Sequence, residues 1–402
     1  MVEELSFAQS FKHLTWTPLV TYTRVTSSDS NENDGLASNG KMIACSWKST
    51  STVAVFNAEK TMAFDANTPL IKGHQGMIYD MAWSPFEDRL LATCADDGKV
   101  KMWVFDDYEG CIGKGNIMDA DLILDAHHRK CMGVKWHEAA ENLLATHSID
   151  KTIKVWDINE DRCGDAIFTF TDMGDYATSI RWSPDGKMIG SMHKNKTMQF
   201  VDPRQEATAL RGNGHVGPRQ QRFDWVDNQT IITTGFESGA KRQWGAWDLR
   251  NLEQPLVLGP LNDGSGVPYF FYDREYSMFI MAGRGDNTTS IYNFDRSSPT
   301  ILNLVQMNNF LSTTHKAFTI MPKHVVDVRN QEVMRAARVT NVGTLEVLAM
   351  RIPSRVGGFN QDYYPPFVAN EPSSKAEDWC AGTDVPAKTM QLTAEKKVQV
   401  KK

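Results

Sequence analysis

Five positions carry the same residue at equal offsets in two successive stretches of the chain, residues 73–104 and 126–157. The matched pairs are His74 and His127, Trp83 and Trp136, Thr93 and Thr146, Asp97 and Asp150, and Trp103 and Trp156. A period of about 40 to 50 residues with a Gly-His entry and a Trp-Asp exit is typical of a blade of four short antiparallel strands. The repeat therefore predicts a β-propeller.

The matched polar residues have a structural interpretation. An entry histidine, a threonine, an aspartate in a tight turn and a tryptophan can form one chain of hydrogen bonds across a blade, and such a network stiffens a fold when it is complete. Between them, Val100 and Met102 alternate with Lys99 and Lys101, as in a strand with one buried face. We interpret two sets as structural rather than catalytic: His74, Thr93, Asp97 and Trp103, and His127, Thr146, Asp150 and Trp156.

Weaker versions of the pattern predict the remaining blades. Met42–Trp47 and Thr52–Asn57 fit a degenerate first blade. Blade four has Lys194 where the turn acid is expected, so its hydrogen-bonded chain should be incomplete. The next three blades are expected from Gly214 to Asp248, from Val267 to Phe294 and from Ile301 to Met350. We expect one all-β, seven-bladed propeller over residues 1–352, closed by an N-terminal strand.

After Ile352 and Pro353 the pattern changes. Aromatic residues and prolines appear without strand or long-helix periodicity, as in the run Tyr363-Tyr364-Pro365-Pro366-Phe367. Exposed aromatic residues in a row would be an aggregation liability, so they should be covered. We therefore expect residues 353–402 to form an extension that packs on one face of the propeller and ends in a solvated tail.

The composition excludes several classes of function. The chain has 43 basic and 49 acidic residues and a net charge of −6, so neither nucleic acid nor an anionic membrane is an expected partner. Its six cysteines include no Cys-x-x-Cys pair, which favours reduced thiols in the cytoplasm over disulfides. The start of the chain lacks the features of a signal peptide, and no apolar run reaches membrane-spanning length. We expect a cytoplasmic protein without a cofactor.

No constellation of an enzyme is evident. His127, His128 and Cys131 do not make a metal site, because neighbours on a strand point to opposite faces and no further ligand has suitable spacing. Gly283-Arg284-Gly285-Asp286 is not a phosphate loop, because no Gly-Lys-Ser/Thr run follows it. We find no pairing of a nucleophile with a base and expect no catalysis.

A second set of motifs runs from about Phe11 to Trp379. It includes Phe11-Lys12-His13-Leu14, Arg24-Val25-Thr26, Thr233-Thr234-Gly235-Phe236, Asp263-Gly264-Ser265-Gly266, Gly283-Arg284-Gly285-Asp286, Met321-Pro322-Lys323, Tyr364-Pro365-Pro366 and Glu377-Asp378-Trp379. In this order the motifs resemble those of the coronins, WD-repeat proteins that bind filamentous actin. The resemblance implies that the last blade takes the N-terminal strand and that the chain regulates the organisation of actin filaments.

The resemblance also implies where filaments bind, around the first, sixth and last blades. The residues it points to are Arg24, Lys12, Arg284, Asp286, Arg351 and Arg355. Thr21 departs from the pattern, because animal members commonly place a second arginine just before the short basic motif. Members usually continue into a linker and an oligomerising coiled coil, which these 402 residues do not contain, so we expect a monomer. The actin-branching complex of actin-related proteins is a further partner implied by the resemblance.

The basic residues are also unevenly distributed along the chain. Between His315 and Val356 we count seven basic residues (316, 323, 329, 335, 338, 351 and 355) against three acidic ones (327, 332 and 346). This predicts a positive patch, at the seam where the two termini meet, that would orient docking on an acidic filament and be screened by salt. The alternative is that these are ordinary strand-edge residues that discourage edge pairing.

A second function class comes from Trp247-Asp248-Leu249-Arg250, echoed by Val201-Asp202-Pro203-Arg204. Trp-Asp-x-Arg at a blade exit resembles the motif by which some propellers dock on ubiquitin-ligase adaptors as substrate receptors. The structural interpretation, a solvated arginine after a blade turn, is favoured because the tetrapeptide is common.

Overall fold

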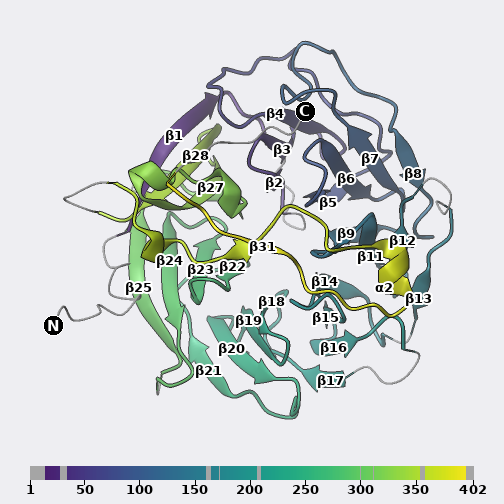
Figure 1. The fold of residues 1–402 in the computed structure, drawn as a ribbon, viewed down its shortest axis with the longest axis vertical. Coiled ribbons are helices and arrows are strands. Elements are labelled where there is room, and N and C mark those ends of the chain that lie inside the picture. Colours follow the sequence, from purple (N-terminus) through teal and green to yellow (C-terminus); the bar gives the residue numbers. More distant parts are fainter. Residues whose placement is uncertain are drawn as a thin grey trace.

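The computed structural model describes residues 14–27, 34–159, 164–171, 173–205, 210–298, 300–310, 312–353 and 358–394. Within these ranges, seven antiparallel sheets are arranged around a central channel, as Figure 1 shows. The prediction of a seven-bladed, all-β propeller is confirmed.

The first three blades follow the chain in order. Blade 1 contains β2 (Leu36–Ser38), β3 (Met42–Ser46) and β4 (Val53–Asn57). Blade 2 contains β5 (Ile78–Trp83), β6 (Leu90–Ala95), β7 (Val100–Val104) and β8 (Leu122–Leu124). Blade 3 contains β9 (Cys131–Trp136), β11 (Leu143–Ser148), β12 (Ile153–Asp157) and β13 (Phe168–Phe170).

The next three blades also follow the chain in order, and in each of them the first strand lies at the channel and the last strand at the outer edge. Blade 4 contains β14 (Ala177–Trp182), β15 (Ile189–His193), β16 (Thr197–Val201) and β17 (Leu210–Asn213). Blade 5 contains β18 (Arg222–Asp227), β19 (Thr230–Phe236), β20 (Arg242–Asp248) and β21 (Val257–Pro260). Blade 6 contains β22 (Pro268–Asp273), β23 (Met278–Gly283), β24 (Thr288–Phe294) and β25 (Leu302–Asn309).

Blade 7 closes the ring. It contains β26 (His315–Ile320), β27 (Glu332–Thr340), β28 (Thr344–Arg351) and, as its outer strand, β1 (Thr15–Thr23). The start predicted for this blade, Ile301, is wrong, because β25 pairs with β24 and so belongs to blade 6. The closure is apolar as well as hydrogen-bonded: Tyr22 and Val347 share a core cluster with Ile43 and Phe56 of blade 1.

The predicted hydrogen-bonded chains are present in blades 2 and 3. In blade 2, His74 Nε2 lies 2.8 Å from Thr93 Oγ1, His74 Nδ1 lies 2.9 Å from Asp97 Oδ2, and Trp103 Nε1 donates to Thr93 Oγ1 at 2.9 Å. In blade 3 the corresponding distances among His127, Thr146, Asp150 and Trp156 are 2.8, 3.0 and 2.9 Å. Threonine is the hub of each network.

The hydrogen-bonded chains of blades 4 and 5 differ from those of blades 2 and 3. In blade 4 the turn position is held by Asn195, not Lys194, and Ser191 Oγ contacts His193 Nε2 of the same strand at 2.9 Å. In blade 5 the chain is rebuilt with an amide, because His215 Nδ1 lies 3.1 Å from Gln243 Oε1. His215 and Trp247 meet there on Thr233 at 2.8 and 2.9 Å.

The extension crosses one face of the disc, in front of the blades in Figure 1. It contains the 3₁₀ turn η4 (Gln361–Tyr363), β29 (Phe367–Val368), β30 (Ser374–Lys375), α2 (Ala376–Cys380) and β31 (Thr389–Met390). β30 pairs with β10 (Ala140–Glu141) and β29 pairs with β31. Packing of the extension on one face is confirmed.

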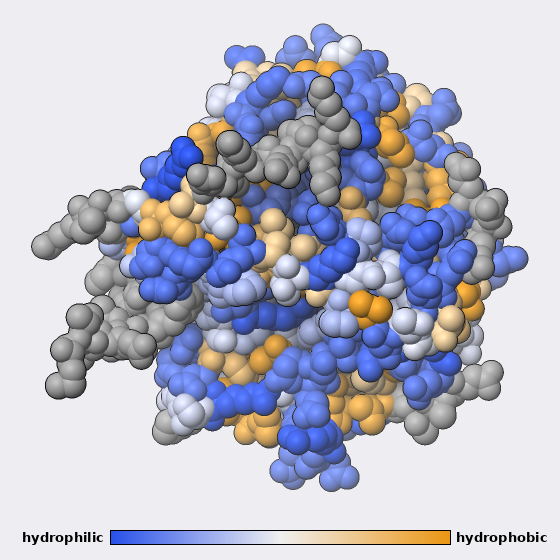
Figure 2. Space-filling model, in the orientation of Figure 1, coloured by the Kyte–Doolittle hydropathy of each residue, from blue (hydrophilic) through white to orange (hydrophobic). Residues whose placement is uncertain are grey.

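The contacts of the extension define two faces. It touches loops that join the first and second strands of blades 3, 4, 6 and 7, through β10, Gly186, Tyr276 and the 3₁₀ turns η2 (Lys323–Val325) and η3 (Val328–Asn330). We call this the covered face. Figure 2 views it, and hydrophilic side chains predominate there. The open face is the opposite side, with the turns that join second and third strands, such as residues 96–99, 149–152, 284–287 and 341–343.

Candidate functional site

Arg24 lies on the open face at the seam between blades 7 and 1. It follows β1, is exposed, and has a φ of 61°. Its backbone neighbours fix it from both sides, because Thr23 N donates to Met62 O at 3.2 Å and Val25 N donates to Gly343 O at 2.9 Å. The β27–β28 turn and the blade 1 segment thus present the arginine to solvent.

Arg284 lies on the same face, in the β23–β24 turn of blade 6. Its guanidinium carbon is 5.8 Å from the centre of the Tyr269 ring, and the side chain is half-buried. Gly285 N donates to His315 O at 2.8 Å. Thr314 N donates to Asn341 Oδ1 at 2.9 Å. These bonds join the turns of blades 6 and 7 to the neighbourhood of Arg24 in one surface.

Asp286 is engaged inside the protein. Its carboxylate forms an ion pair with Arg242, whose side chain is fully buried, and one of the two oxygens accepts from Nη2 at 3.3 Å. Arg242 also donates from Nε to Gly266 O at 2.9 Å. The pair links blade 5 to blade 6. A contact of Asp286 with a partner stays a prediction, and its structural contribution is evident.

Arg351 lies on the opposite side of the disc. In the pairing of β1 with β28, Thr23 is opposite Thr344 at one end and Thr15 is opposite Arg351 at the other. At about 3.3 Å per residue, the two ends of β28 are about 23 Å apart. Arg24 and Arg351 therefore belong to different faces. The prediction of a single patch at the seam is wrong for these two residues, and Lys12 and Arg355 lie outside the described residues.

Three of the seven basic residues counted along residues 315–356 form ion pairs within the fold. Lys323 Nζ lies 2.5 Å from Asp273 and 2.8 Å from Glu275. Arg335 pairs with the buried Glu332 at 2.7 Å, and Arg338 pairs with Glu346 at 2.7 Å. Burial raises the pKa of Asp273 to about 6, against the pull of Lys323. The Lys323 pairs join blade 7 to blade 6, and the pairs of Arg335 and Arg338 lie within blade 7, so these three side chains are engaged inside the fold.

On the covered face, an arginine of blade 4 is occupied by the extension. Arg204 donates from Nε to Asp202 at 3.0 Å and from Nη1 to Asp384 at 2.7 Å, and its guanidinium lies 4.6 Å from the centre of the Trp379 ring. Trp379 is buried and donates from Nε1 to Gly186 O at 2.9 Å. Arg204, in the weaker echo of the Trp-Asp-x-Arg motif, therefore holds the extension against blade 4.

Arg250, in the stronger Trp-Asp-x-Arg copy, has a different environment. Its side chain is 70% exposed and pairs with Asp248 at 2.5 Å. Hydrogen bonds from Arg250 lower the pKa of Asp248 to about 2. The arginine is solvated, as the structural interpretation of this motif expects.

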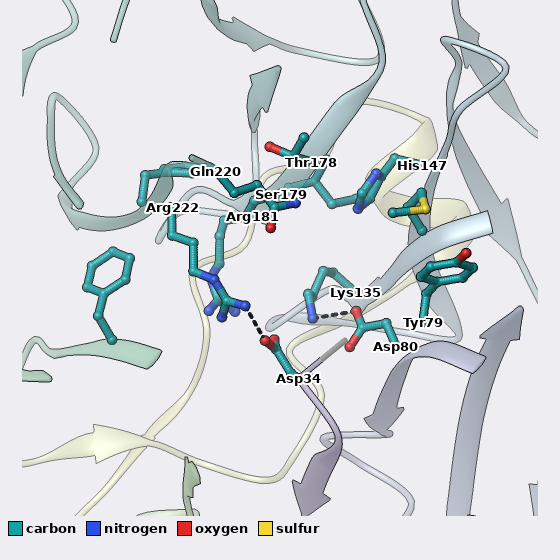
Figure 3. A pocket seen from close by; sticks show the side chains of 14 residues that line it. Asp34, Tyr79, Asp80, Lys135, His147, Thr178, Ser179, Arg181, Gln220 and Arg222 are labelled. Atoms are coloured by element: carbon teal, nitrogen blue, oxygen red, sulfur yellow. Dashed lines mark hydrogen bonds and ion pairs between the residues drawn. The ribbon is translucent and has the colours of Figure 1, made fainter. Parts of the chain in front are cut away.

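The central channel holds charged residues that the sequence analysis did not single out. Figure 3 shows Lys135 beside Asp80, at 2.7 Å, and Arg222 beside Asp34, at 2.5 Å. Arg181 points into the same cavity of about 50 Å³, which has room for little more than water. For two of these residues the sequence held a signal, because Lys135 and Arg181 each precede the inner-strand tryptophan of a blade.

Two kinds of site are absent from the part of the chain that the structure describes. No group of three or more His, Cys, Asp or Glu residues there could hold a metal ion. No described helix is long and apolar enough to cross a membrane.

Comparison with known proteins shows which proteins the chain is similar to. The model "WD domain, G-beta repeat" matches residues 67–104 and 121–157. The chain is 30% identical over 362 residues to a coronin-like protein of Saccharomyces cerevisiae, covering 87% of this chain and 54% of the relative. It is 27% identical over 332 residues to human coronin-2A, covering 82% of this chain and 62% of the relative. Over most of its length the chain is therefore similar to coronins, at 27 to 30% identity.

The solved structures agree with this family in fold. The WD40 domain of Toxoplasma gondii coronin superposes with a TM-score of 0.86 at 24% identity, over 95% of this chain and 98% of that one. The chain spans about half the length of the fungal coronin-like relatives it matches. The similarity therefore covers both the propeller and the extension.

Proposed function

We propose that the chain binds filamentous actin through the open face over blades 6, 7 and 1, with Arg24 and Arg284 as contacts. Similarity to coronins over most of the chain makes an actin-associated WD-repeat protein the expected class, and the motif Arg24-Val25-Thr26 carries the resemblance at this surface. In this proposal the propeller is a rigid platform whose loops carry recognition, in the cytoplasm and at the actin cytoskeleton.

The backbone conformation of Arg24 is the observation that supports this surface most directly. A φ of 61° suits glycine and disfavours residues with a Cβ by about 1 kcal/mol or more. An arginine kept in this conformation, and exposed, fits a role in contacting a partner better than a role in stabilising the fold.

The test is cosedimentation with actin filaments for the wild-type chain and for Arg24→Gly. Glycine is suited to this φ, so the variant should keep or slightly raise the unfolding midpoint while pelleting less. Pelleting of the wild-type chain should also fall as salt is raised from about 50 mM to about 200 mM, because exposed charges are screened. Equal pelleting of Arg24→Gly and wild type would remove Arg24 from the contact surface.

We also propose a limit on what this chain does alone. It presents one such surface, so it should bind filaments as a monomer and not bundle them, because cross-linking needs at least two sites. Bundles seen by electron microscopy with these 402 residues alone would contradict this. The actin-branching complex is a second proposed partner, tested by pull-down with the purified complex.

Docking on a ubiquitin-ligase adaptor is the second candidate, and one observation keeps it open: the side chain of Arg250, on the covered face, is 70% exposed. Arg204 in the weaker copy is occupied by Asp202, Asp384 and Trp379, so only the Arg250 copy presents its arginine. Co-purification with an adaptor that is lost in Arg250→Ala would support this function. No co-purification would remove it.

A further inference from the structure

A groove lies on the open face over blades 2 to 5, on the other side of the ring from Arg24. It has a volume of about 730 Å³ and is bordered by loops that enter blades 3, 4 and 5 and by the β11–β12 and β15–β16 turns. Tyr79, Thr178 and Gln220, labelled in Figure 3, line both this groove and the channel cavity, so the groove is the open mouth of the channel.

The lining of this groove is strongly basic in a chain that is acidic as a whole. Five basic residues line it and one acid does: Arg129, Lys130, Lys151, Lys194 and Lys196, against Asp175. The local excess is therefore four positive charges, whereas the whole chain carries −6. A concave surface lined by one sign of charge attracts ligands of the opposite sign.

Two of these lysines occupy positions that are unfavourable for lysine. Lys151 and Lys196 have φ values of 65° and 73° at the tips of the β11–β12 and β15–β16 turns. The equivalent position of blade 2 is Gly98, with a φ of 72°. Glycine is the residue suited to this conformation, and residues held in it against their preference cluster at functional sites. Blades 3 and 4 thus place a lysine where glycine would be favoured, at neighbouring turns facing one groove.

The contacts of these lysines leave their charge uncompensated. Lys151 Nζ donates to Gly174 O at 3.0 Å, and Lys196 Nζ donates to Arg219 O. Carbonyl groups orient an ammonium group but do not neutralise it. Burial lowers the pKa of Lys196, as expected where no carboxylate balances desolvation. Lys130 differs, because it pairs with Asp96 at 2.9 Å.

We propose that this groove binds an extended acidic peptide segment of a partner protein. The cations come from separate turns along the groove rather than converging on one point, which suits carboxylates spaced along a chain better than a single phosphate group. Between them lie Met132, Ile149, Tyr176 and Pro218, which can receive an apolar side chain of the same peptide. This surface is independent of the proposed filament contacts at Arg24 and Arg284.

The test uses fluorescence anisotropy with a labelled peptide of six glutamates and one phenylalanine, and the double variant Lys151→Gly/Lys196→Gly. We expect saturable binding to the wild-type chain and affinity at least about tenfold weaker for the double variant, with an unfolding midpoint that is unchanged or higher. Arg24→Gly should bind the peptide like wild type, and the double variant should pellet with actin filaments like wild type.

Three outcomes would overturn the proposal. The first is no saturable binding of the peptide to the wild-type chain. The second is equal affinity for wild type and the double variant. The third is capture of the wild-type chain by vesicles containing a phosphoinositide, with loss of capture in the double variant and no binding of the peptide, which would assign the groove to a lipid headgroup instead.

Discussion

The two faces of the propeller use basic residues differently. On the covered face, Lys323, Arg335 and Arg204 each pair with at least one carboxylate. Lys323 joins blade 7 to blade 6, Arg335 pairs within β27, and Arg204 joins blade 4 to the extension. On the open face, Arg24 and Lys151 are exposed at the tips of loops. The comparison suggests that positive charge contributes to the fold on one face and to recognition on the other.

Residues with a left-handed backbone conformation show the same contrast between the two faces. In the described part of the chain, the non-glycine residues with positive φ on the covered face are all uncharged: Asn142, Ser277, Ile301 and Gln331. Those on the open face are Arg24, Lys151, Lys196 and Ala240. Three of these four are basic. An uncharged residue in such a turn serves chain reversal, whereas a long cation adds nothing that the turn itself needs.

The largest expected effect is on the covered face, from Trp379→Ala. Trp379 is 2% exposed and packs against Trp182, His137 and Arg204. Its removal should cost about 3 to 5 kcal/mol of the free energy of unfolding, as for other buried tryptophans. Urea unfolding measures this loss, and at low temperature the folded variant should still pellet with filaments. Lost pelleting of a fully folded variant would mean that the covered face takes part in binding.

Acid should destabilise the protein through histidines under the open face. Burial lowers the pKa of His147 and of His315 to about 3, helped by Lys135 and Arg338 respectively. Both are neutral when folded, so their contribution to stability is present above the ordinary pKa of about 6.5 and is lost as the pH falls below it. Each should cost up to about 2 kcal/mol of the free energy of unfolding at pH 5.

Unfolding curves at pH 7 and pH 5 test this effect, with His315→Gln as the comparison. Because the variant lacks one of the groups that take up a proton on unfolding, its loss of stability between the two pH values should be smaller than that of wild type. An equal loss in both proteins would mean that His315 titrates normally in the folded state.

The smallest expected effect on stability comes from a comparison of Arg250, in the Trp-Asp-x-Arg motif, with Arg204, in its weaker echo. Arg204→Ala removes charged hydrogen bonds to Asp202 and Asp384 from a side chain that is only 10% exposed, and should lower the free energy of unfolding by about 2 kcal/mol. Arg250→Ala removes an exposed pair and should leave the unfolding midpoint unchanged. Equal stability of the two variants would show that the extension does not depend on Arg204.

Much of the fold could be predicted because its signals are local. The hydrogen-bonded chains of blades 2 and 3 follow from five matched offsets, and β1 closes the ring as expected. The blade 5 chain was missed for two reasons. Gln243 replaces the acid, and an insertion separates Thr233 from Trp247 by 14 residues, where the corresponding separation in blade 2 is 10.

The site was harder to predict because residues that are close in sequence can lie on different faces of the propeller. Residues 315–351 run along three antiparallel strands and the loops between them, so basic residues that are close in sequence fall at both ends of the blade. The count of charges could not reveal this, nor that Glu332 lies buried beside Arg335. The groove lysines were not recognised because the strain at Lys151 and Lys196 is a backbone property that residue type alone does not disclose.

The most direct test of the two-face account is cosedimentation with actin filaments of a matched pair, Arg24→Glu and Arg250→Glu. Both reverse the charge of an exposed arginine, one on the open face and one on the covered face. The account expects at least about fivefold weaker pelleting for Arg24→Glu, roughly 1 kcal/mol, and wild-type pelleting for Arg250→Glu. Equal loss in both variants, or loss only in Arg250→Glu, would contradict it.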